Sequence, residues 1–360
     1  MKRYGNLWEK FITEENFILA YKNAKKNKSK LKSVQNFAKN WATKLEKIRQ
    51  NVKNFNFHTA GYKQKTIYEP KERIIYILPF KPDRIVQHAV MNILTPIFEK
   101  LFIKDSYACI KGRGQHKGSL RCMEFVRRNK YCLKCDIRKF YPSIDQSILY
   151  YLIEKVIKDK MLLCIIKDIV FSFKGGKNVP IGNLTSQWFG NFYMTPLDRV
   201  VKQELKVKDY IRYCDDFCLF SNDKQFLRQC KERIKEYINK ELSLEFSKCD
   251  IFNTKQGVDF LGYRHFKDYI LVRKNTAKRL IKSVTELPIL LADGRLTKEE
   301  YRSKVASAYG VLKHANSYNL QVKLQINILR DKIKKEIEEE RRLRRIEKAR
   351  IKELKCQKVA

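Results

Sequence analysis

The chain has 360 residues, 44% of them hydrophobic, so it is long enough to bury a substantial core and is not expected to be disordered. Its 77 lysine and arginine residues outnumber its 39 aspartate and glutamate residues, and the formal net charge of +38 indicates a polyanionic partner. No apolar run approaches the ~20 residues of a membrane span, and the N-terminus lacks an apolar secretory core. We therefore expect a cytoplasmic protein that does not bind membranes.

The ten cysteines are scattered along the chain, as expected of buried thiols in a reducing compartment. Cys132 and Cys135 form one C-x-x-C pair, but no second pair has zinc-finger spacing and the five histidines do not cluster. The pair lies on a predicted strand, where positions i and i+3 face opposite sides. The pattern disfavours a cysteine metal site.

The first part of the chain is predicted to contain a helical region, a basic hairpin and a second helix. Apolar residues have helical spacing up to about residue 50, and alternation from Gly61 to Phe80 with a turn at residues 69–72 predicts a hairpin. Residues 83–100 carry an apolar helical stripe. Residues 111–118 form a glycine-rich basic loop. Its composition fits a loop that approaches a phosphate backbone and a plain mobile turn about equally well.

The second part predicts strands separated by helices, which indicates an α+β fold. Beyond about residue 272 the chain becomes helical and basic, and residues 331–360 favour an isolated charged helix or frayed tail slightly over a binding arm. The predicted elements are a strand at 131–137, helices at 146–158 and 161–171, a loop leading into a buried helix at 182–204, a hairpin at 210–220, a helix at 223–242 and a strand at 258–263.

Three aspartates have the spacing of a catalytic metal site. Asp215 and Asp216 are adjacent in the predicted hairpin, and Asp136 lies on the upstream strand. Acids on neighbouring strands can hold two divalent cations roughly 3.5–4 Å apart, the arrangement used for phosphoryl transfer onto a polynucleotide end. We expect two Mg²⁺ ions, or Mn²⁺, bridged by Asp136 and Asp215, with the Ile137 carbonyl as a further ligand. Asp216 contributes either mainly electrostatically or as a ligand of the metal near the primer end. The alternative is that Asp215 and Asp216 form a plain turn and that Asp136 is an exposed acid on a strand. It is disfavoured because the residues that flank Asp215 and Asp216 are apolar.

Four segments, residues 136–141, 213–216, 244–248 and 258–263, resemble in order and spacing the palm motifs of reverse transcriptases. The resemblance spans roughly residues 60–320 and implies an α+β right-hand polymerase fold that carries out RNA-directed DNA synthesis. The implied domains are an N-terminal helical region (1–55), fingers (56–130), a palm (131–265, with part of the fingers inserted at about 146–190), a helical thumb (266–328) and a basic C-terminal helix or tail (329–360).

The resemblance also implies roles for individual residues. Tyr141 matches the aromatic residue that excludes a 2′-hydroxyl and so selects dNTPs, although a core tyrosine is the alternative. Arg73 and Lys71 resemble the fingers residues that grip the triphosphate, a task suited to the planar donor fork of arginine. Lys248 resembles a lysine near the pyrophosphate, a candidate general acid, or is one of many surface lysines. Ile181 is placed beside the nascent pair, and the expected template or primer contacts are Gly182, Gln187 and Tyr213.

The segment Pro180 to Gln187 decides the resemblance to a subfamily. Most reverse transcriptases have Gln-Gly-x-x-x-Ser-Pro there, whereas this chain has Ile181-Gly182 and then Ser186-Gln187. That pattern is similar to the reverse transcriptases of diversity-generating retroelements, which copy a template-repeat RNA into cDNA with errors opposite adenines. The resemblance implies a structured template RNA, a cDNA or DNA primer, and a small basic ring-forming accessory protein. The alternatives are a phage-defence or other bacterial reverse transcriptase, and a catalytically inactive RNA-binding relative.

Overall fold

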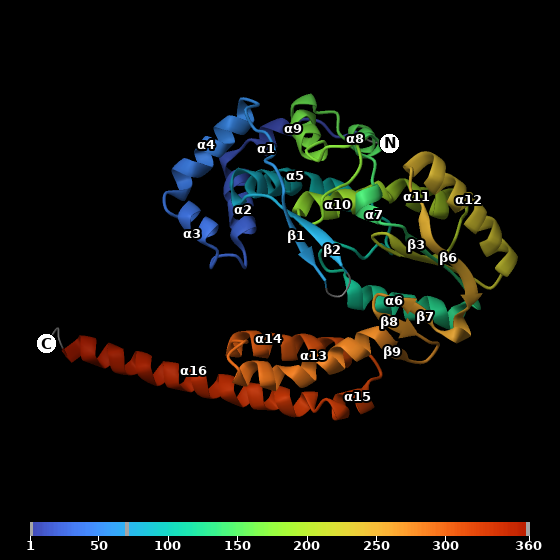
Figure 1. The fold of residues 1–360 in the computed structure, drawn as a ribbon. Coiled ribbons are helices and arrows are strands. Elements are labelled where there is room, and N and C mark those ends of the chain that lie inside the picture. Colours follow the sequence, from blue (N-terminus) through green and yellow to red (C-terminus); the bar gives the residue numbers. More distant parts are fainter. Residues whose placement is uncertain (1–2, 69–71, 358–360) are drawn as a thin grey trace. The chain divides into compact units, whose positions relative to one another are not determined.

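The computed structural model describes residues 3–68 and 72–357, with side chains to residue 350 (Figure 1). The chain divides into two compact units, residues 1–121 with 128–253, and residues 122–127 with 254–360. Each unit has its own hydrophobic core. None of the helices in the described part of the chain combines the length and apolar character that crossing a membrane would require.

A four-stranded antiparallel sheet with the order β4-β5-β3-β6 lies at the centre of the first unit. Strand β3 (Tyr131–Ile137) pairs with β5 (Asp216–Ser221) on one side and with β6 (Phe246–Asn253) on the other. Strand β4 (Asp209–Tyr213) completes the sheet as the partner of β5. Helix α12 (Lys224–Leu242) contacts β3, β5 and β6. Its buried residues have helical spacing and form one apolar face: Leu227, Cys230, Ile234, Ile238 and Leu242.

The structure confirms the predicted strand at 131–137, the hairpin around Asp215 and the helix at 223–242. Strand β6 was not predicted. It lies at an edge of the sheet, where Ser247, Lys248 and Asp250 are exposed, so its sequence lacks the apolar alternation that indicates a half-buried strand.

The first two helices of the chain pack on helix α5 (Ile85–Leu101), which was predicted at residues 83–100. Its apolar stripe is buried, with Val86, Val90 and Leu94 fully covered. The Thr13 hydroxyl caps helix α2 (Glu14–Lys25) by accepting a hydrogen bond from Asn16 N at 3.2 Å. The remaining elements of this region are α1 (Trp8–Phe11), α3 (Lys32–Ala38), α4 (Trp41–Lys53) and the π-helical turn η1 (Phe80–Arg84).

The predicted basic hairpin consists of strands β1 (Lys63–Ile67) and β2 (Arg73–Ile77), and most of its turn lies outside the described residues. Tyr76 N donates a hydrogen bond to Ile181 O at 2.7 Å, which joins β2 to the segment before α10. Gly182 has a φ of +120°, and a Cβ there would lie 2.5 Å from Tyr76 O, so this position requires glycine. The other helices nearby are α7 (Phe140–Ser143), α8 (Gln146–Glu154), α9 (Lys160–Val170), α10 (Leu184–Tyr193), α11 (Thr195–Arg199) and η2 (Val200–Glu204).

The predicted glycine-rich loop at 111–118 is a loop only in its first half, because helix α6 (Gln115–Arg128) begins at Gln115. Gly112 and Gly114, which precede the helix, have positive φ values of 77° and 119°. The long amphipathic helix α6 was not predicted. Its first turn has a polar sequence of Gln, His, Lys and Gly, which resembles a loop in composition.

The second unit contains a small sheet and a helical bundle. The predicted strand at 258–263 is instead two strands, because the backbone reverses at Leu261 and Gly262, which both have positive φ. Thr297 and Glu300 form a capping box at the start of α14. The elements of this unit are β7 (Val258–Phe260), β8 (Tyr263–His265), β9 (Ile270–Val272), α13 (Lys274–Ala292), α14 (Lys298–Lys313), α15 (Tyr318–Lys323) and α16 (Ile326–Gln357).

Candidate active site

Three carboxylates, Asp136, Asp215 and Asp216, meet at one end of the central sheet and are called the acidic cluster below. Asp136 on β3 lies directly opposite Asp216 on β5, and Asp215 occupies the tight turn between β4 and β5. Cys214 has a φ of +58°, which lets the chain reverse over two residues. The pKa of Asp215 is raised to about 6, mainly by burial and further by the negative charges of Asp136 and Asp216. The three acids therefore repel one another electrostatically.

Two polar side chains contact the acidic cluster. Lys134, two residues before Asp136 on β3, forms an ion pair with Asp216 in which Nζ lies 2.9 Å from Oδ1. Ser247 on β6 donates a hydrogen bond from Oγ to Asp136 Oδ2 at 2.6 Å. A β-bulge follows Asp136 in the pairing of β3 with β6. Lys134 and Ser247 thus orient two of the acids, and sequence analysis identified neither.

The donor set of the acidic cluster fits a divalent cation. Among the described residues no group of three His, Cys, Asp or Glu side chains is assembled closely enough to hold a metal ion alone. Mg²⁺ does not require such a group, because it takes one or two carboxylates and completes its shell with water and substrate phosphates. Asp136 and Asp215 supply those carboxylates, and a cation between them would relieve the repulsion that raises the pKa of Asp215. Ile137, whose carbonyl was predicted as a further ligand, is the last residue of β3 and is buried.

A buried ionic network holds the turn that carries Asp215. Arg212 is fully buried, donates from Nη1 to Cys214 O at 3.0 Å and to Asn191 Oδ1 at 2.7 Å, and donates from Nε to Asp198 Oδ1 at 2.7 Å. Tyr210 OH donates to the same Asp198 oxygen at 2.7 Å. Arg212 is therefore a positioning residue for the turn. Its sequence signal was an arginine inside an otherwise apolar strand, which has to be paired when buried.

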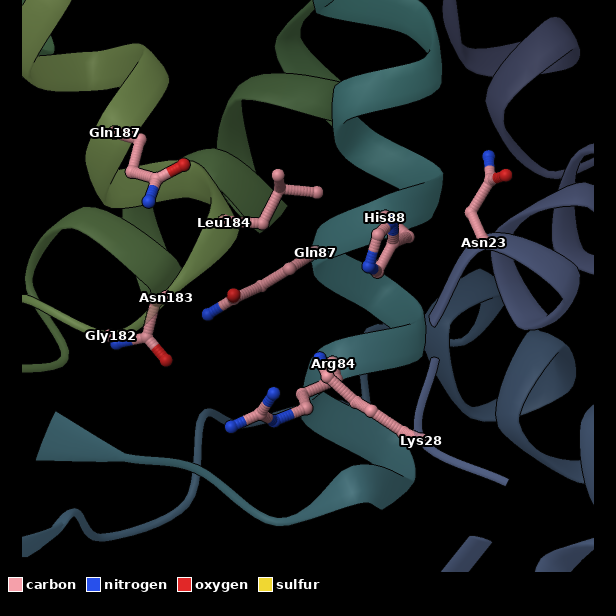
Figure 2. A pocket seen from close by; sticks show the side chains of 9 residues that line it. All are labelled: Asn23, Lys28, Arg84, Gln87, His88, Gly182, Asn183, Leu184 and Gln187. Atoms are coloured by element: carbon pink, nitrogen blue, oxygen red, sulfur yellow. The ribbon is translucent and has the colours of Figure 1, made fainter. Parts of the chain in front are cut away.

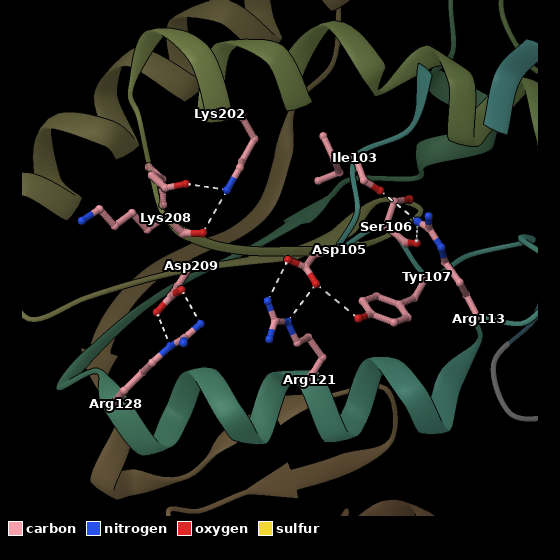
Figure 3. A network of polar contacts seen from close by, with 11 residues as sticks. Ile103, Asp105, Ser106, Tyr107, Arg113, Arg121, Arg128, Lys202, Lys208 and Asp209 are labelled. Carbon is pink, nitrogen blue, oxygen red and sulfur yellow. Dashed lines mark hydrogen bonds and ion pairs between the residues drawn. The ribbon is translucent and has the colours of Figure 1, made fainter. Parts of the chain in front are cut away.

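A second set of contacts joins strand β4 to neighbouring segments, and Figure 3 shows two of its ion pairs, Asp105 with Arg121 and Asp209 with Arg128. Arg212 N donates to Asp105 O and Tyr107 N donates to Arg212 O, both at 3.0 Å, so the chain segment around Ser106 lies alongside β4. The Asp105 carboxylate accepts from Arg121 Nε at 2.9 Å. At the start of the strand Arg128 forms an ion pair with Asp209 at 2.7 Å. These contacts hold the strand that leads into the acidic cluster.

Tyr141 lies beside the same turn. It belongs to the one-turn helix α7, which follows Lys139 in the left-handed conformation, and its OH lies 3.4 Å from Cys214 Sγ. Burial raises the pKa of its phenol, so it stays protonated. A Cβ at Gly190 of α10 would lie 2.9 Å from Tyr141 Cε1. The absence of a side chain at Gly190 therefore leaves the space in which the aromatic ring rests.

The other predicted site residues are distributed around this centre. The positive charge of Arg73, at the start of β2, lowers the pKa of Asp215, so the two side chains lie within electrostatic reach. Lys248 is exposed on β6, opposite Asp136. Tyr213 ends β4 next to the turn and is partly buried. Lys71 lies outside the described residues.

Gly182 and Gln187, two of the predicted template or primer contacts, line a pocket whose walls do not include the acidic cluster (Figure 2). Its basic residues are Lys28, Arg84 and His88, and it is called the basic pocket below. Ile181, just before Gly182, is partly buried and is held through its backbone contact with Tyr76. The structure thus brings Asp136, Asp215, Asp216 and Tyr141 together but places Gly182 and Gln187 in a different cavity.

Comparison with known proteins identifies the family. Residues 62–265, more than half of the chain, match the sequence model of the family described as reverse transcriptase (RNA-dependent DNA polymerase). The chain belongs to the reverse transcriptase family. It is an RNA-directed DNA polymerase with the α+β right-hand polymerase fold, in a family whose enzymes generally use divalent metals.

The relatives include a retron protein and a group II intron-encoded protein, both from bacteria. The chain is 25% identical over 286 residues to the retron Ec73 reverse transcriptase of Escherichia coli, covering 74% of this chain and 84% of that protein. It is 23% identical over 353 residues to the group II intron-encoded protein LtrA of Lactococcus lactis subsp. cremoris, covering 77% of this chain and 58% of LtrA. A weaker similarity, 21% over 170 residues, links it to the mitochondrial nuclear intron maturase 4 of Arabidopsis thaliana, with 44% of this chain and 21% of the maturase covered.

Proposed function

We propose that this reverse transcriptase copies a template-repeat RNA into adenine-mutagenised cDNA that diversifies a target gene. The observation that carries the proposal is the Ile181-Gly182 pair in place of the usual Gln-Gly. The backbone of Ile181 is fixed by the hydrogen bond from Tyr76, and Gly182 admits no side chain, so the side chain of Ile181 has a defined place. The predicted domain limits, from the N-terminal helical region to the C-terminal helix, belong to the same proposal.

The acidic cluster is the proposed catalytic centre. Asp136 and Asp215 would hold Mg²⁺, or Mn²⁺, with the Ile137 carbonyl, while Asp216 contributes negative charge and is oriented by Lys134. When bound, two such ions activate the primer hydroxyl and neutralise the leaving pyrophosphate. The network around Arg212 keeps the Asp215 turn in place, so the carboxylates need not rearrange when substrate binds.

Nucleotide selection is assigned to residues around the cluster. Arg73 would bind the triphosphate through its planar donor fork, together with Lys71. The ring of Tyr141, confined between Cys214 and Gly190, would exclude a 2′-hydroxyl from the incoming nucleotide. Lys248 would lie near the pyrophosphate as a proton donor. Tyr213 would contact the primer or template close to the turn.

Ile181 supplies a physical account of low fidelity. A glutamine at this position can hydrogen-bond beside the nascent pair, whereas isoleucine can neither donate nor accept. One hydrogen bond contributes about 0.5–1.5 kcal/mol, and roughly 1.4 kcal/mol is a tenfold change in selection. The missing interaction is therefore large enough to lower fidelity, although it does not by itself single out adenine.

The proposed partners are the template-repeat RNA, a cDNA or DNA primer and a small basic ring-forming accessory protein. With a net charge of +38 on the polymerase, the RNA would have to neutralise both proteins in such a complex. Binding to RNA should weaken steeply with salt, because each neutralised phosphate of a single strand adds about −0.7 to the log–log slope.

A retron-type or other bacterial reverse transcriptase is the second candidate. The similarity to the retron Ec73 reverse transcriptase, which covers 84% of that protein, favours this candidate. A retron-type enzyme would not be expected to make errors specifically opposite adenine. A catalytically inactive RNA-binding role is less favoured, because Asp136, Asp215, Asp216 and Tyr141 are all in place.

The test is cDNA synthesis on an adenine-containing RNA template, with Mg²⁺, dNTPs, flanking RNA and the accessory protein, followed by sequencing of the product. Substitutions concentrated opposite adenines, and a complete loss of product in Asp215→Ala, are expected. Accurate cDNA would instead support the retron-type candidate. An Asp215→Ala variant as active as the parent would contradict catalysis by the acidic cluster.

A further inference from the structure

The basic pocket combines positive charge with polar groups that have no partner. It is a cavity of about 240 Å³ between α2, α5 and the N-terminus of α10, and Figure 2 shows Gln87 and the tip of Arg84 directed into it. This volume is many times the ~10–15 Å³ of cavity space that one water molecule needs, so the cavity has room for a polar ligand much larger than water. Its lining contains no acidic residue.

The three basic residues are partly buried, and the charges of Lys28 and Arg84 repel each other and disfavour protonation of His88. The pKa of His88 is lowered to about 4, first by burial and then by the charges of Lys28 and Arg84. Burial, and the charge of Arg84, also lower the pKa of Lys28, and burial lowers that of Arg84. Arg84 makes one long hydrogen bond, from Nε to Leu78 O at 3.4 Å. An anion in the pocket would remove this repulsion.

Two amide side chains in the pocket are nearly inaccessible and keep unused hydrogen-bonding capacity. Gln87 is 2% exposed, and within the described part of the chain its side-chain amide makes no hydrogen bond. Asn183 is 4% exposed and its Oδ1 has no hydrogen-bond partner, while its Nδ2 donates to Pro180 O at 3.3 Å. Leaving a buried atom such as Asn183 Oδ1 unsatisfied costs about 1–3 kcal/mol. Its retention, beside the Gln87 amide that Figure 2 shows directed into the pocket, points to a ligand that donates and accepts hydrogen bonds. Asn183 also precedes the first turn of α10, whose backbone N–H groups favour a negative charge.

We propose that the basic pocket binds one nucleotide of the RNA strand, with its phosphate next to Lys28, Arg84 and His88 and its ribose 2′-hydroxyl next to Asn183 and Gln87. The 2′-hydroxyl is both donor and acceptor and is absent from DNA, so it can donate to Asn183 Oδ1 and accept from the Gln87 amide. The pocket would therefore distinguish an RNA strand from a DNA strand. Lys28 and Asn23 lie before residue 62, so part of this recognition comes from outside the segment that matches the family. The proposal rests on the RNA-copying function but not on adenine mutagenesis.

The test is a binding titration of the whole protein with an RNA template annealed to a DNA primer, in which single template nucleotides are replaced in turn by 2′-deoxynucleotides. For the wild type, one position should weaken binding by about 3- to 10-fold, the range expected for one or two hydrogen bonds. In Asn183→Ala that position should become less sensitive, because only the Gln87 contact remains, while the all-ribose template binds more weakly. Gln87→Met, which nearly conserves volume, provides the same comparison if Asn183→Ala does not fold.

The phosphate contact is tested with a matched pair of lysines. Lys28→Gln should reduce the log–log salt slope by about 0.7 and weaken binding to every template. Lys26→Gln removes the same charge from an exposed neighbour and should change the slope much less. Equal effects of the two lysines, or a 2′-deoxy scan that is the same in wild type, Asn183→Ala and Gln87→Met, would overturn the proposal. Because the titration requires no catalysis, this result would leave the error spectrum of the cDNA as an independent test of the proposed function.

Discussion

The acidic cluster and the basic pocket lie in the same unit of the chain and have opposite charges. In the first, burial and like charges raise the pKa of Asp215 to about 6, and in the second they lower the pKa of His88 to about 4. Each region gathers one sign of charge where solvent is partly excluded, which disfavours the isolated protein and favours a ligand of the opposite sign. The comparison suggests that the cluster is built for cations and the pocket for phosphate.

The two regions differ in how they are supported. The acidic cluster lies on paired strands and is held by the buried Arg212 network, by Lys134 and by Ser247. The basic pocket is made from helix ends and connecting segments, and its amides Gln87 and Asn183 retain unused hydrogen-bonding capacity. The first arrangement suits a fixed chemical geometry, and the second suits a ligand that completes the site. The predictions below separate these roles.

The largest expected effect is the loss of cDNA synthesis in Asp215→Asn. The substitution preserves shape but removes the negative charge that a divalent cation requires. Primer extension should fall below detection, whereas RNA binding should be retained, since the basic pocket is unchanged. Retained extension in Asp215→Asn would separate the acidic cluster from catalysis.

Arg212→Met should have the largest effect on stability. It leaves Asp198 buried without its ionic partner, and breaking a buried pair in this way costs about 3–5 kcal/mol. Chemical denaturation measures the change in the free energy of unfolding. Arg233→Met, which disrupts an exposed pair with Glu204, is the control and should have a much smaller effect. Similar losses in both variants would contradict the positioning role of Arg212.

Gly190→Ala should lower the preference for dNTPs over rNTPs. The new Cβ would lie 2.9 Å from Tyr141 Cε1 and push the ring from its place. A loss of about tenfold in the ratio of kcat/KM values corresponds to roughly 1.4 kcal/mol. Tyr141→Phe keeps the ring and loses only the contact with Cys214, so it should keep the preference. If Tyr141→Phe were as unselective as Gly190→Ala, steric exclusion by the ring would be the wrong explanation.

Acid should destabilise the wild type more than His88→Gln. The pKa of His88 in the folded protein, about 4, is below its unfolded value near 6.5, so the unfolded state binds the proton first. The stabilising contribution is complete above pH 6.5 and is lost as pH falls towards 4. Denaturation of both proteins across this range measures the difference. An RNA phosphate held beside Lys28, Arg84 and His88 should reduce the difference in stability between the two proteins. Identical pH profiles of the two proteins would contradict the lowered pKa of His88.

The smallest expected effect is that of Ser247→Ala. It removes the hydrogen bond from Oγ to Asp136 Oδ2, an interaction worth about 0.5–1.5 kcal/mol. The rate of single-nucleotide addition should fall by roughly 2- to 10-fold, with the free energy of unfolding little changed because Ser247 is exposed. A loss as large as that of Asp215→Asn would mean that Ser247 has a more direct role.

The sequence predicted the parts of the site that are carried by local patterns. Paired acids between apolar strands placed Asp136, Asp215 and Asp216 at one end of a sheet, and the resemblance to reverse transcriptases placed Tyr141 near them. Strand β6 was missed because an exposed edge strand has little apolar alternation, and helix α6 was missed because its polar first turn resembles a loop. The contacts of Arg212 with Asp198 and Asn191 depend on tertiary packing. The same holds for the proximity of Lys28, Arg84 and His88 in one pocket. The apolar strand around Arg212 signals that the arginine needs a partner, but local sequence identifies neither its partners nor the members of the basic pocket.

The most direct test of the central claim is the error spectrum of cDNA made by the wild type, Ile181→Gln and Ile181→Leu on one RNA template. The account predicts frequent substitutions opposite adenine in the wild type and in Ile181→Leu, which keeps an apolar side chain. It predicts errors reduced by up to about tenfold in Ile181→Gln, where a hydrogen-bonding group is restored. An adenine error rate in Ile181→Gln equal to that of the wild type would contradict the role of Ile181, and accurate copying by the wild type would contradict the mutagenic function itself.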